Sequence, residues 1–168
     1  RRFQALRMPT IAAINGVAAG AGSSLAMSCD VVVAAPHASF IQAFSKIGLI
    51  PDAGGTFLLA HRLGLARATA LAMTGDKLSA AQAKEWGVVW EVAEDCVAAA
   101  EALAQRLAAM PTQALVRTRH LLRDAMTSSF EAQLQAERDA QSALAKTHDY
   151  FEGVTAFLEK RAPVFKGA

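Results

Sequence analysis

Asp52 is the residue of this chain best placed for acid–base chemistry. It follows Ile50-Pro51 and stands directly before Ala53-Gly54-Gly55-Thr56 and an apolar run. A carboxylate at such a position can take up and return a proton. It can also cap a helix, because an Asp side chain accepts a hydrogen bond from a free N–H of the first turn. Spacing by itself favours capping, so both roles stand as hypotheses.

A second candidate element is the small-residue segment Gly16–Gly22. It lacks the Gly-Lys-Ser/Thr ending of a phosphate-binding loop and the acidic residue of a dinucleotide-binding fold, which argues against nucleotide binding. Small residues before a helix let backbone N–H groups approach a ligand, and the helix dipole adds positive potential. The segment can therefore stabilise an oxyanion. Close packing of a helix on a strand is the alternative explanation.

The remaining residues that could take part in catalysis or metal binding fit structural roles better. Cys29 and Cys96 lie far apart without metal-ligand spacing, which predicts buried free thiols and a reducing, cytoplasmic setting. The histidines also lack metal-ligand or triad-like spacing. We therefore expect no metal site.

Composition bounds the class of protein. The chain has 168 residues, 53% of them hydrophobic, and a net charge of +2, which is too balanced for a general nucleic-acid binder. No apolar run approaches the roughly 20 residues that span a bilayer, so we expect no membrane segment. Nor do we expect a signal peptide. The chain begins without Met, and residues 2–7 read as the end of a helix, so we expect an N-terminal portion beyond it.

Hydrophobic periodicity predicts an alternating first half and a helical second half. The first half reads as strands at 10–15, 31–35, 39–41 and 88–92, with short helices at 24–29, 57–62, 66–73 and 79–87. The second half reads as helices at 97–109, 113–126, 130–146 and 150–160.

Several separated motifs resemble the enoyl-CoA hydratase/isomerase, or crotonase, superfamily. In chain order they are Pro9–Gly16, Gly20-Ala21-Gly22, Cys29-Asp30, Ile50–Thr56, Met73–Ala83 and Glu152–Arg161. The resemblance implies an α/β, crotonase-like (ClpP/crotonase) spiral fold. Residues 1–94 would form the C-terminal part of its core, with the acyl-CoA site, and residues 95–168 a helical trimerisation region. It further implies a homotrimer or hexamer without a cofactor, coenzyme A being part of the substrate.

The same resemblance assigns roles to site residues. The backbone N–H of Ala21 would donate to the thioester oxygen in the oxyanion hole, and the family's other donor lies upstream of this chain. The two glutamates with which hydratases activate water align with Ser24 and Phe44, neither of which is a carboxylate. Asp52 matches a position where isomerase-type members carry an acid. Isomerisation is therefore favoured over hydration.

Within the superfamily, Ala43–Thr56, Lys84–Trp90 and Gln133–Asp139 are similar to isomerases that act on the ring epoxide of phenylacetyl-CoA in phenylacetate catabolism. The resemblance implies a substrate pocket formed by Ser24, Phe44, Ile47 and Leu49. We expect Asp52 to be buried among four apolar side chains: Phe44, Ile47, Leu49 and Phe57. Alternatives are an enoyl-CoA isomerase or hydratase of fatty-acid oxidation, or a non-catalytic homologue.

The C-terminal helix carries a further implied role. In the family this helix often reaches the CoA of a neighbouring subunit, which places Phe157 near the adenine and Lys160 near a phosphate. A lysine suits phosphate as a point charge, whereas a solvated helix end is the alternative explanation.

Overall fold

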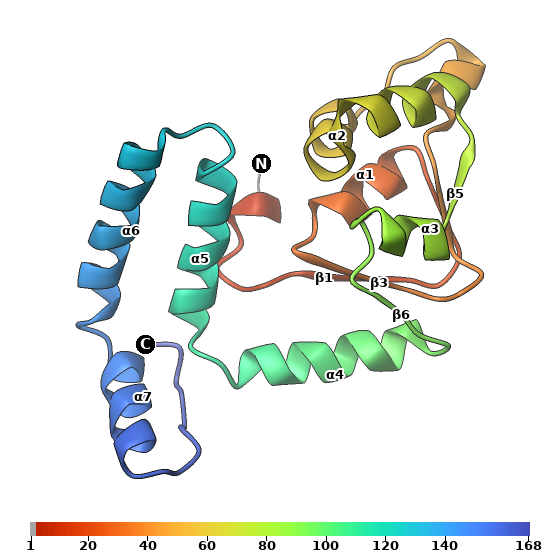
Figure 1. Cartoon of the computed structure of the whole chain (residues 1–168). Helices are drawn as coiled ribbons and strands as arrows, with labels where there is room; N and C mark the ends of the chain where they lie inside the picture. Colours follow the sequence, from red (N-terminus) through yellow and green to blue (C-terminus); the bar gives the residue numbers. More distant parts are fainter. Residues whose placement is uncertain (1–2) are drawn as a thin grey trace. The chain divides into compact units, whose positions relative to one another are not determined.

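The computed structural model describes residues 3–168, with Gln4 described by its backbone alone. It divides into two compact units, which are described separately. The N-terminal unit contains Thr10–Leu103 with Phe3 and Gln4, and the C-terminal unit contains Ala5–Pro9 and Ala104–Ala168. Figure 1 draws most of the first unit in red to green and most of the second in cyan to blue.

The N-terminal unit contains two three-stranded sheets. The first is parallel, in the order β1 (Ile11–Ile14), β3 (Val31–Ala34) and β6 (Glu91–Val92), and the second has the order β2 (Val17–Ala19), β4 (Ser39–Ile41) and β5 (Lys77–Ser79). In the second sheet β2 and β4 are parallel, whereas β4 and β5 are antiparallel. Val32 and Val33 of the central strand are at most 1% exposed, as expected for a continuous apolar strand covered on both faces.

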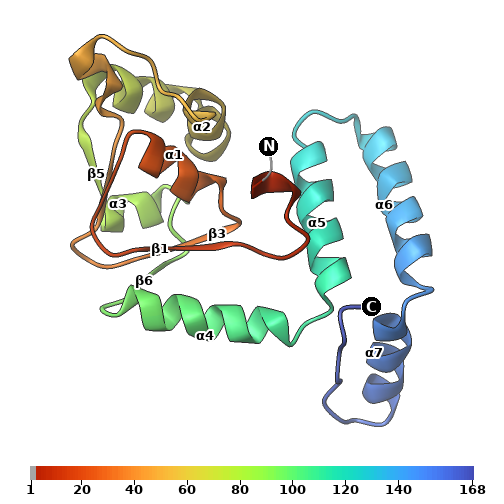
Figure 2. The same ribbon diagram turned by 180° about the vertical axis from the view of Figure 1, so that it is seen from behind.

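Helices pack on these sheets. They are α1 (Ala21–Ser28), α2 (Gly55–Thr74), α3 (Ala80–Glu85) and a 3-10 helix, η2 (Ala43–Ile47). Gly64 has φ 73° and kinks α2, because only glycine adopts that conformation without strain. Ser79 caps α3 by accepting a hydrogen bond from the Gln82 N–H at 3.2 Å. α1 and α2 pack against each other, as both ribbon views show (Figures 1 and 2).

A glycine makes the approach of α1 and α2 possible. A Cβ at Gly55 would lie 2.6 Å from Ser24 Oγ and 3.1 Å from Pro51 Cβ. The first distance is shorter than real Cβ contacts allow, so residue 55 must lack a side chain. The second glycine of the Gly54-Gly55 pair is therefore a packing requirement.

The C-terminal unit is helical. Its helices are α4 (Cys96–Ala108), which begins in the N-terminal unit, α5 (Thr112–Asp124), α6 (Phe130–Leu144) and α7 (His148–Leu158). Ser129 and Thr147 cap α6 and α7 by accepting bonds from Ala132 N–H and Tyr150 N–H. Across residues 3–168, no helix has the length and apolar character to cross a membrane.

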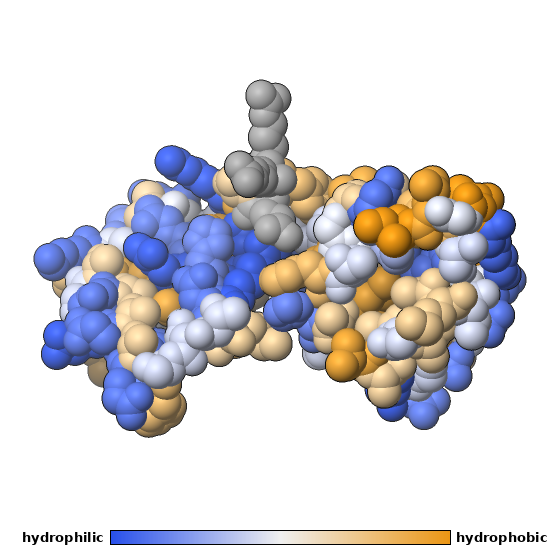
Figure 3. All heavy atoms as spheres, turned by 90° about the horizontal axis from the view of Figure 1, so that it is seen from above, coloured by the Kyte–Doolittle hydropathy of each residue, from blue (hydrophilic) through white to orange (hydrophobic). Residues whose placement is uncertain are grey.

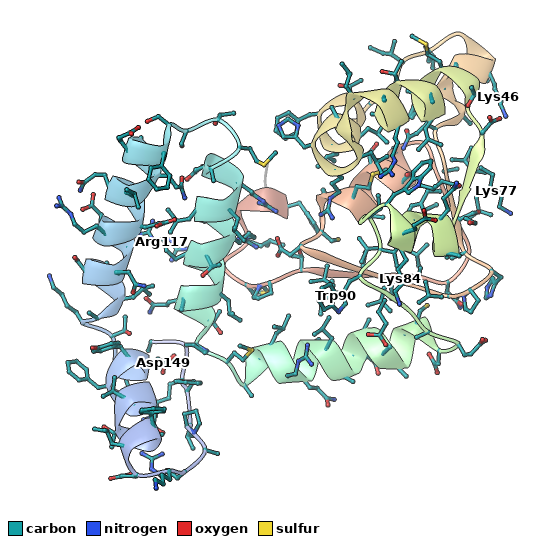
Figure 4. The ribbon with its side chains drawn as sticks, in the orientation of Figure 1. Lys46, Lys77, Lys84, Trp90, Arg117 and Asp149 are labelled. Atoms are coloured by element: carbon teal, nitrogen blue, oxygen red, sulfur yellow. The ribbon has the colours of Figure 1, made fainter. Side chains whose placement is uncertain are left out.

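Two carboxylates of α7 hold the last residues of the chain. Asp149 is 5% exposed and accepts hydrogen bonds of 2.8 Å from the Lys166 and Gly167 N–H groups. Glu152 accepts from Nη1 and Nη2 of Arg161 at 2.7 and 2.9 Å, and from the Val164 N–H at 2.7 Å. Figure 4 marks Asp149 at the start of α7. The segment after α7 is thus fixed along the helix.

These contacts lower the pKa of both carboxyl groups. The Arg161 side chain, followed by the Val164 N–H, lowers the pKa of Glu152 from 4.5 to about 2. Burial on its own would raise the pKa of Asp149, but bonds from Lys166, His148 and Gly167 outweigh it, and the net pKa lies below its usual range. Both groups therefore favour the folded state when ionised.

Most expected elements are confirmed, but β5 was not expected and the helices expected at 57–62 and 66–73 form the single helix α2. Three further expectations are corrected. β2 lies inside the segment read as a glycine turn, because three residues suffice to pair with β4. The strand expected at 88–92 is limited to β6, since Val88 N–H and Val89 N–H both donate to the Ala83 carbonyl instead. The helix end expected over residues 2–7 is a single 3-10 turn, η1 (Phe3–Ala5), with Arg2 outside the described residues.

Both cysteines are free and buried, as expected from the sequence. Burial, with a further contribution from Asp30, raises the pKa of the Cys29 thiol, which keeps it protonated and unreactive.

Replacement of Gly55 by Ala should destabilise the protein by about 1–3 kcal/mol, because the added methyl overlaps Ser24 Oγ. Chemical denaturation measures the loss. The matched control is Gly22→Ala on α1, where a Cβ meets nothing within 4 Å; it should be neutral or stabilising by up to about 1 kcal/mol. Ser24→Ala should recover part of the loss in the double variant, and an additive double variant would contradict the contact.

The Glu152 contacts should make the C-terminal segment sensitive to acid. Because its folded pKa of about 2 lies below the ordinary 4.5, the stabilisation is complete above pH 4.5 and lost as the pH falls through 2. The stability difference between wild type and Glu152→Gln, followed by thermal unfolding from pH 7 to 2, should therefore shrink across that window. Glu137→Gln, an exposed residue of α6, is the control. A difference independent of pH would contradict the assignment.

Candidate functional site

The glycine segment enters α1 at Gly20. Its φ of 51° and ψ of −124° suit glycine, and its N–H donates to the Ile41 carbonyl at 2.9 Å, which ties the turn to β4. Ala21 is the first residue of α1 and is exposed. An N–H of the first helical turn has no acceptor within the helix, and the helix dipole is positive there. The Ala21 N–H is therefore suited to bind a ligand oxygen.

Ser24 and Phe44 both pack against this turn. A Cβ at Gly20 would lie 3.3 Å from the Phe44 ring, and Ser24 Oγ donates to the Gly20 carbonyl at 3.5 Å. The two positions expected to carry glutamates in a hydratase therefore converge on the residue before Ala21. Ser24 is 0% exposed, so its side chain does not reach the surface of this unit. It lies beneath the turn, between α1 and Gly55 of α2.

Asp52 lies in a tight turn at the start of α2. Its carbonyl accepts a hydrogen bond from the Gly55 N–H at 2.7 Å, and the two residues between them have positive φ: 51° at Ala53 and 82° at Gly54. Two positive values in succession are typical of a type I′ turn. The left-handed region is unfavourable for alanine, and such strain clusters at functional sites.

The capping hypothesis for Asp52 is wrong. The N-cap of α2 is Gly54, and no side chain makes the capping hydrogen bond. If Asp52 were the N-cap, α2 would begin at residue 53. The left-handed residues Ala53 and Gly54 instead form a turn, so the helix begins two positions later, at Gly55. The Asp52 side chain is thereby left exposed and free of a capping role.

Apolar side chains flank Asp52 without covering it. Exposed fractions are 71% for Ile47, 60% for Leu49 and 59% for Phe57, while Phe44 is half-buried against Gly20. The expectation of a buried Asp52 is therefore wrong for this unit, because three of its four expected neighbours face outward. Figure 3 shows hydrophobic surface on the N-terminal unit, at the right.

A polar pair behind the turn was missed by sequence reasoning. Gln42 is 2% exposed and donates through Nε2 to Ser23 Oγ at 3.0 Å, linking the end of β4 to α1. Its Oε1 has no hydrogen-bond partner among the described residues. The signal available in the sequence was a lone amide directly after an apolar strand. The pair supports the start of α1, beneath Ala21 and Ser24.

The expected CoA contacts lie on α7 and directly after it, in the C-terminal unit. Phe157 is 81% exposed and, with Leu158, Phe165 and Tyr150, lines an apolar hollow of about 410 Å³. Lys160, also exposed, follows the helix end with φ 54°. Within residues 3–168, no three His, Cys, Asp or Glu side chains lie close enough to hold a metal ion.

Comparison with known proteins identifies the family. The profile of the enoyl-CoA hydratase/isomerase family matches residues 1–168. The chain is 50% identical to 1,2-epoxyphenylacetyl-CoA isomerase of Escherichia coli K12, over 99% of this chain and 64% of that protein. It is 43% identical to a probable enoyl-CoA hydratase of Rhodobacter capsulatus, over 95% of this chain and 63% of that protein.

Solved structures agree with this fold. The crystal structure of an enoyl-CoA hydratase from Polaromonas sp. JS666 superposes with a TM-score of 0.93 at 38% identity, covering 97% of this chain and 64% of that one. The chain thus spans less than two thirds of the length of these relatives. On the family match and this superposition, the chain belongs to the enoyl-CoA hydratase/isomerase family and has its crotonase fold.

Proposed function

We propose that the protein of which this chain is part isomerises acyl-CoA thioesters, with Asp52 as acid and base and the Ala21 N–H as one oxyanion donor. The observation that carries the proposal is the contact of Gly55 with Ser24, which ties the Asp52 turn to the helix that begins at Ala21. A carboxylate and a free N–H are the two groups that enolate chemistry requires.

The mechanism follows from these two groups. Hydrogen bonding to the thioester oxygen stabilises the enolate that forms when Asp52 removes a proton beside the carbonyl. The protonated Asp52 then returns that proton to a carbon two bonds away, so the double bond moves and no atom is gained or lost. Removal of one oxyanion donor in other enzymes typically costs about 10²–10³ in rate.

The choice of isomerisation over hydration rests on Ser24 and Phe44. Hydration requires groups that position and activate water, and neither a serine buried against Gly55 nor a phenylalanine ring against Gly20 supplies a proton-transfer group. Asp52 is then the acid available for proton transfer, which suits a reaction that moves a proton within one substrate.

The substrate we propose is 2-(1,2-epoxy-1,2-dihydrophenyl)acetyl-CoA, the ring epoxide of phenylacetyl-CoA. The 50% identical relative is named 1,2-epoxyphenylacetyl-CoA isomerase, and the exposed Ile47 and Leu49 offer an apolar surface to an aromatic ring. Phe157 and Lys160 would contact the adenine and a phosphate of CoA in a homotrimer or hexamer. No cofactor beyond the CoA of the substrate is required.

A second candidate is an enoyl-CoA isomerase or hydratase acting on straight-chain substrates. It is supported by the names of two relatives, a probable enoyl-CoA hydratase of Rhodobacter capsulatus and an enoyl-CoA hydratase from Polaromonas sp. JS666. Turnover of a 2-enoyl-CoA to the 3-hydroxy product, without isomerisation of the epoxide, would favour it. Binding of CoA without turnover of any substrate would indicate a non-catalytic homologue.

Replacement of Asp52 by Asn in the whole protein should lower kcat for epoxyphenylacetyl-CoA and 3-enoyl-CoA by about 10²–10⁴, because Asn is nearly isosteric but transfers no proton. Steady-state assays with these substrates and a 2-enoyl-CoA measure the change. Asp76→Asn, an exposed aspartate of the same unit, is the matched control and should keep wild-type rates. Unchanged isomerisation in Asp52→Asn would refute the assignment.

Replacement of Ala21 by Pro removes the proposed donor where a helix tolerates proline, because the first helical residue needs no N–H for the helix itself. We expect kcat to fall about 10²–10³ with little change in thermal stability. Ala21→Gly, which keeps the N–H, is the matched control and should retain activity. Equal rates for the two variants would show that this N–H is not a donor.

A further inference from the structure

α7 ends in a helix cap that normally calls for glycine. The Arg161 N–H donates to the Ala156 carbonyl at 3.0 Å and the Lys160 N–H to the Phe157 carbonyl at 3.3 Å, the two bonds of a Schellman motif. The left-handed position of that motif is Lys160, with φ 54°. Glycine occupies this position most often, because a Cβ is unfavourable there.

Such strain is rare in this chain. Among the described residues, only Ala53 and Lys160 combine a side chain with positive φ. Ala53 adjoins the proposed acid–base residue, and Lys160 is the proposed phosphate contact. Strained residues persist where the surrounding structure holds them and where function uses them.

Side chains on both sides of Lys160 close the cap. Arg161 donates through Nε to Glu159 at 2.6 Å, and its Nη1 and Nη2 form a two-bond contact with the carboxylate of Glu152. Residues 159 and 161, which flank Lys160, are thus joined to each other, and Arg161 is anchored to Glu152, about two turns earlier on α7. Asp149 extends the anchoring to the Lys166 and Gly167 N–H groups.

The ion pairs of Arg161 leave the Lys160 ammonium as the cation available to a ligand. Arg161 engages Glu152 and Glu159, the two carboxylates beside the helix end. The Lys160 side chain is exposed and makes no hydrogen bond or ion pair with any described residue. A phosphate therefore meets an ammonium whose nearby carboxylates are already paired.

We infer that Glu152 and Arg161 are positioning residues, which hold Lys160 in the left-handed conformation and keep its ammonium free for a phosphate of the CoA nucleotide. The inference rests on the proposed function. It adds that two charged residues, Arg161 beside Lys160 and Glu152 about two turns before it, act on affinity through Lys160 and take no part in chemistry.

Replacement of Lys160 by Gly separates ligand binding from folding. Because glycine relieves the left-handed strain, the melting temperature of the whole protein should rise, while the Kd for CoA, measured by titration calorimetry, should rise about tenfold. For a thioester of pantetheine, which lacks the nucleotide, KM should rise less than for the CoA thioester. Lys146→Ala, an exposed lysine of the same unit, is the control and should leave Kd unchanged.

Titration with 3′-dephospho-CoA identifies the phosphate. If Lys160→Gly and wild type bind this ligand equally, Lys160 contacts the 3′-phosphate. If Lys160→Gly still binds it more weakly than wild type, Lys160 contacts the diphosphate. Either result supports the inference. An unchanged Kd for both ligands in Lys160→Gly overturns it.

A double-variant cycle tests the positioning role. Glu152→Gln should weaken CoA binding severalfold in wild type and have no further effect on Kd in the Lys160→Gly background, because its influence runs through Lys160. Equal effects in both backgrounds would show that Glu152 is only structural. Failure of wild type to bind CoA at all would instead refute the proposed function, and the inference with it.

Discussion

The approach of α1 to α2 at Ser24 and Gly55 is the constraint on which the candidate site depends. A Cβ at residue 55 would lie 2.6 Å from Ser24 Oγ, so the helices meet at a separation that only glycine permits. Ala21 begins the helix that carries Ser24, and Asp52 closes the turn that leads into Gly55. A packing contact with no chemistry of its own therefore fixes the Ala21 N–H and the Asp52 turn relative to each other.

Two backbone positions, one in each unit, are strained. Ala53 and Lys160 adopt a conformation that favours glycine, and each adjoins a residue or is itself a residue with a proposed role. The strain is held differently in the two places. At Ala53 the Asp52–Gly55 hydrogen bond closes the turn, whereas at Lys160 the Schellman bonds and the Arg161 ion pairs do so. Each conformation costs stability, which the neighbouring contacts offset.

The sequence position of Asp52 did not reveal how exposed its neighbours are in the fold. Ile47, Leu49 and Phe57 are more than half exposed, and clustered exposed apolar side chains mark surfaces that bind a ligand or another protein. Ser24, by contrast, supports the site from within the core, so a shared sequence motif does not imply a shared role in contacting substrate.

The sequence by itself determined the family, most of the helices, the strands at 11–14, 31–34 and 39–41, and the absence of glutamates at positions 24 and 44. These features are local in origin, because they depend on motif, hydrophobic period and the preferences of single residues. Only the tertiary structure decided that Asp52 is not a cap, that Ser24 is buried, that β6 is short and that Glu152 anchors Arg161. Each of these depends on a contact or a backbone angle set by residues elsewhere in the chain, which periodicity and spacing do not encode.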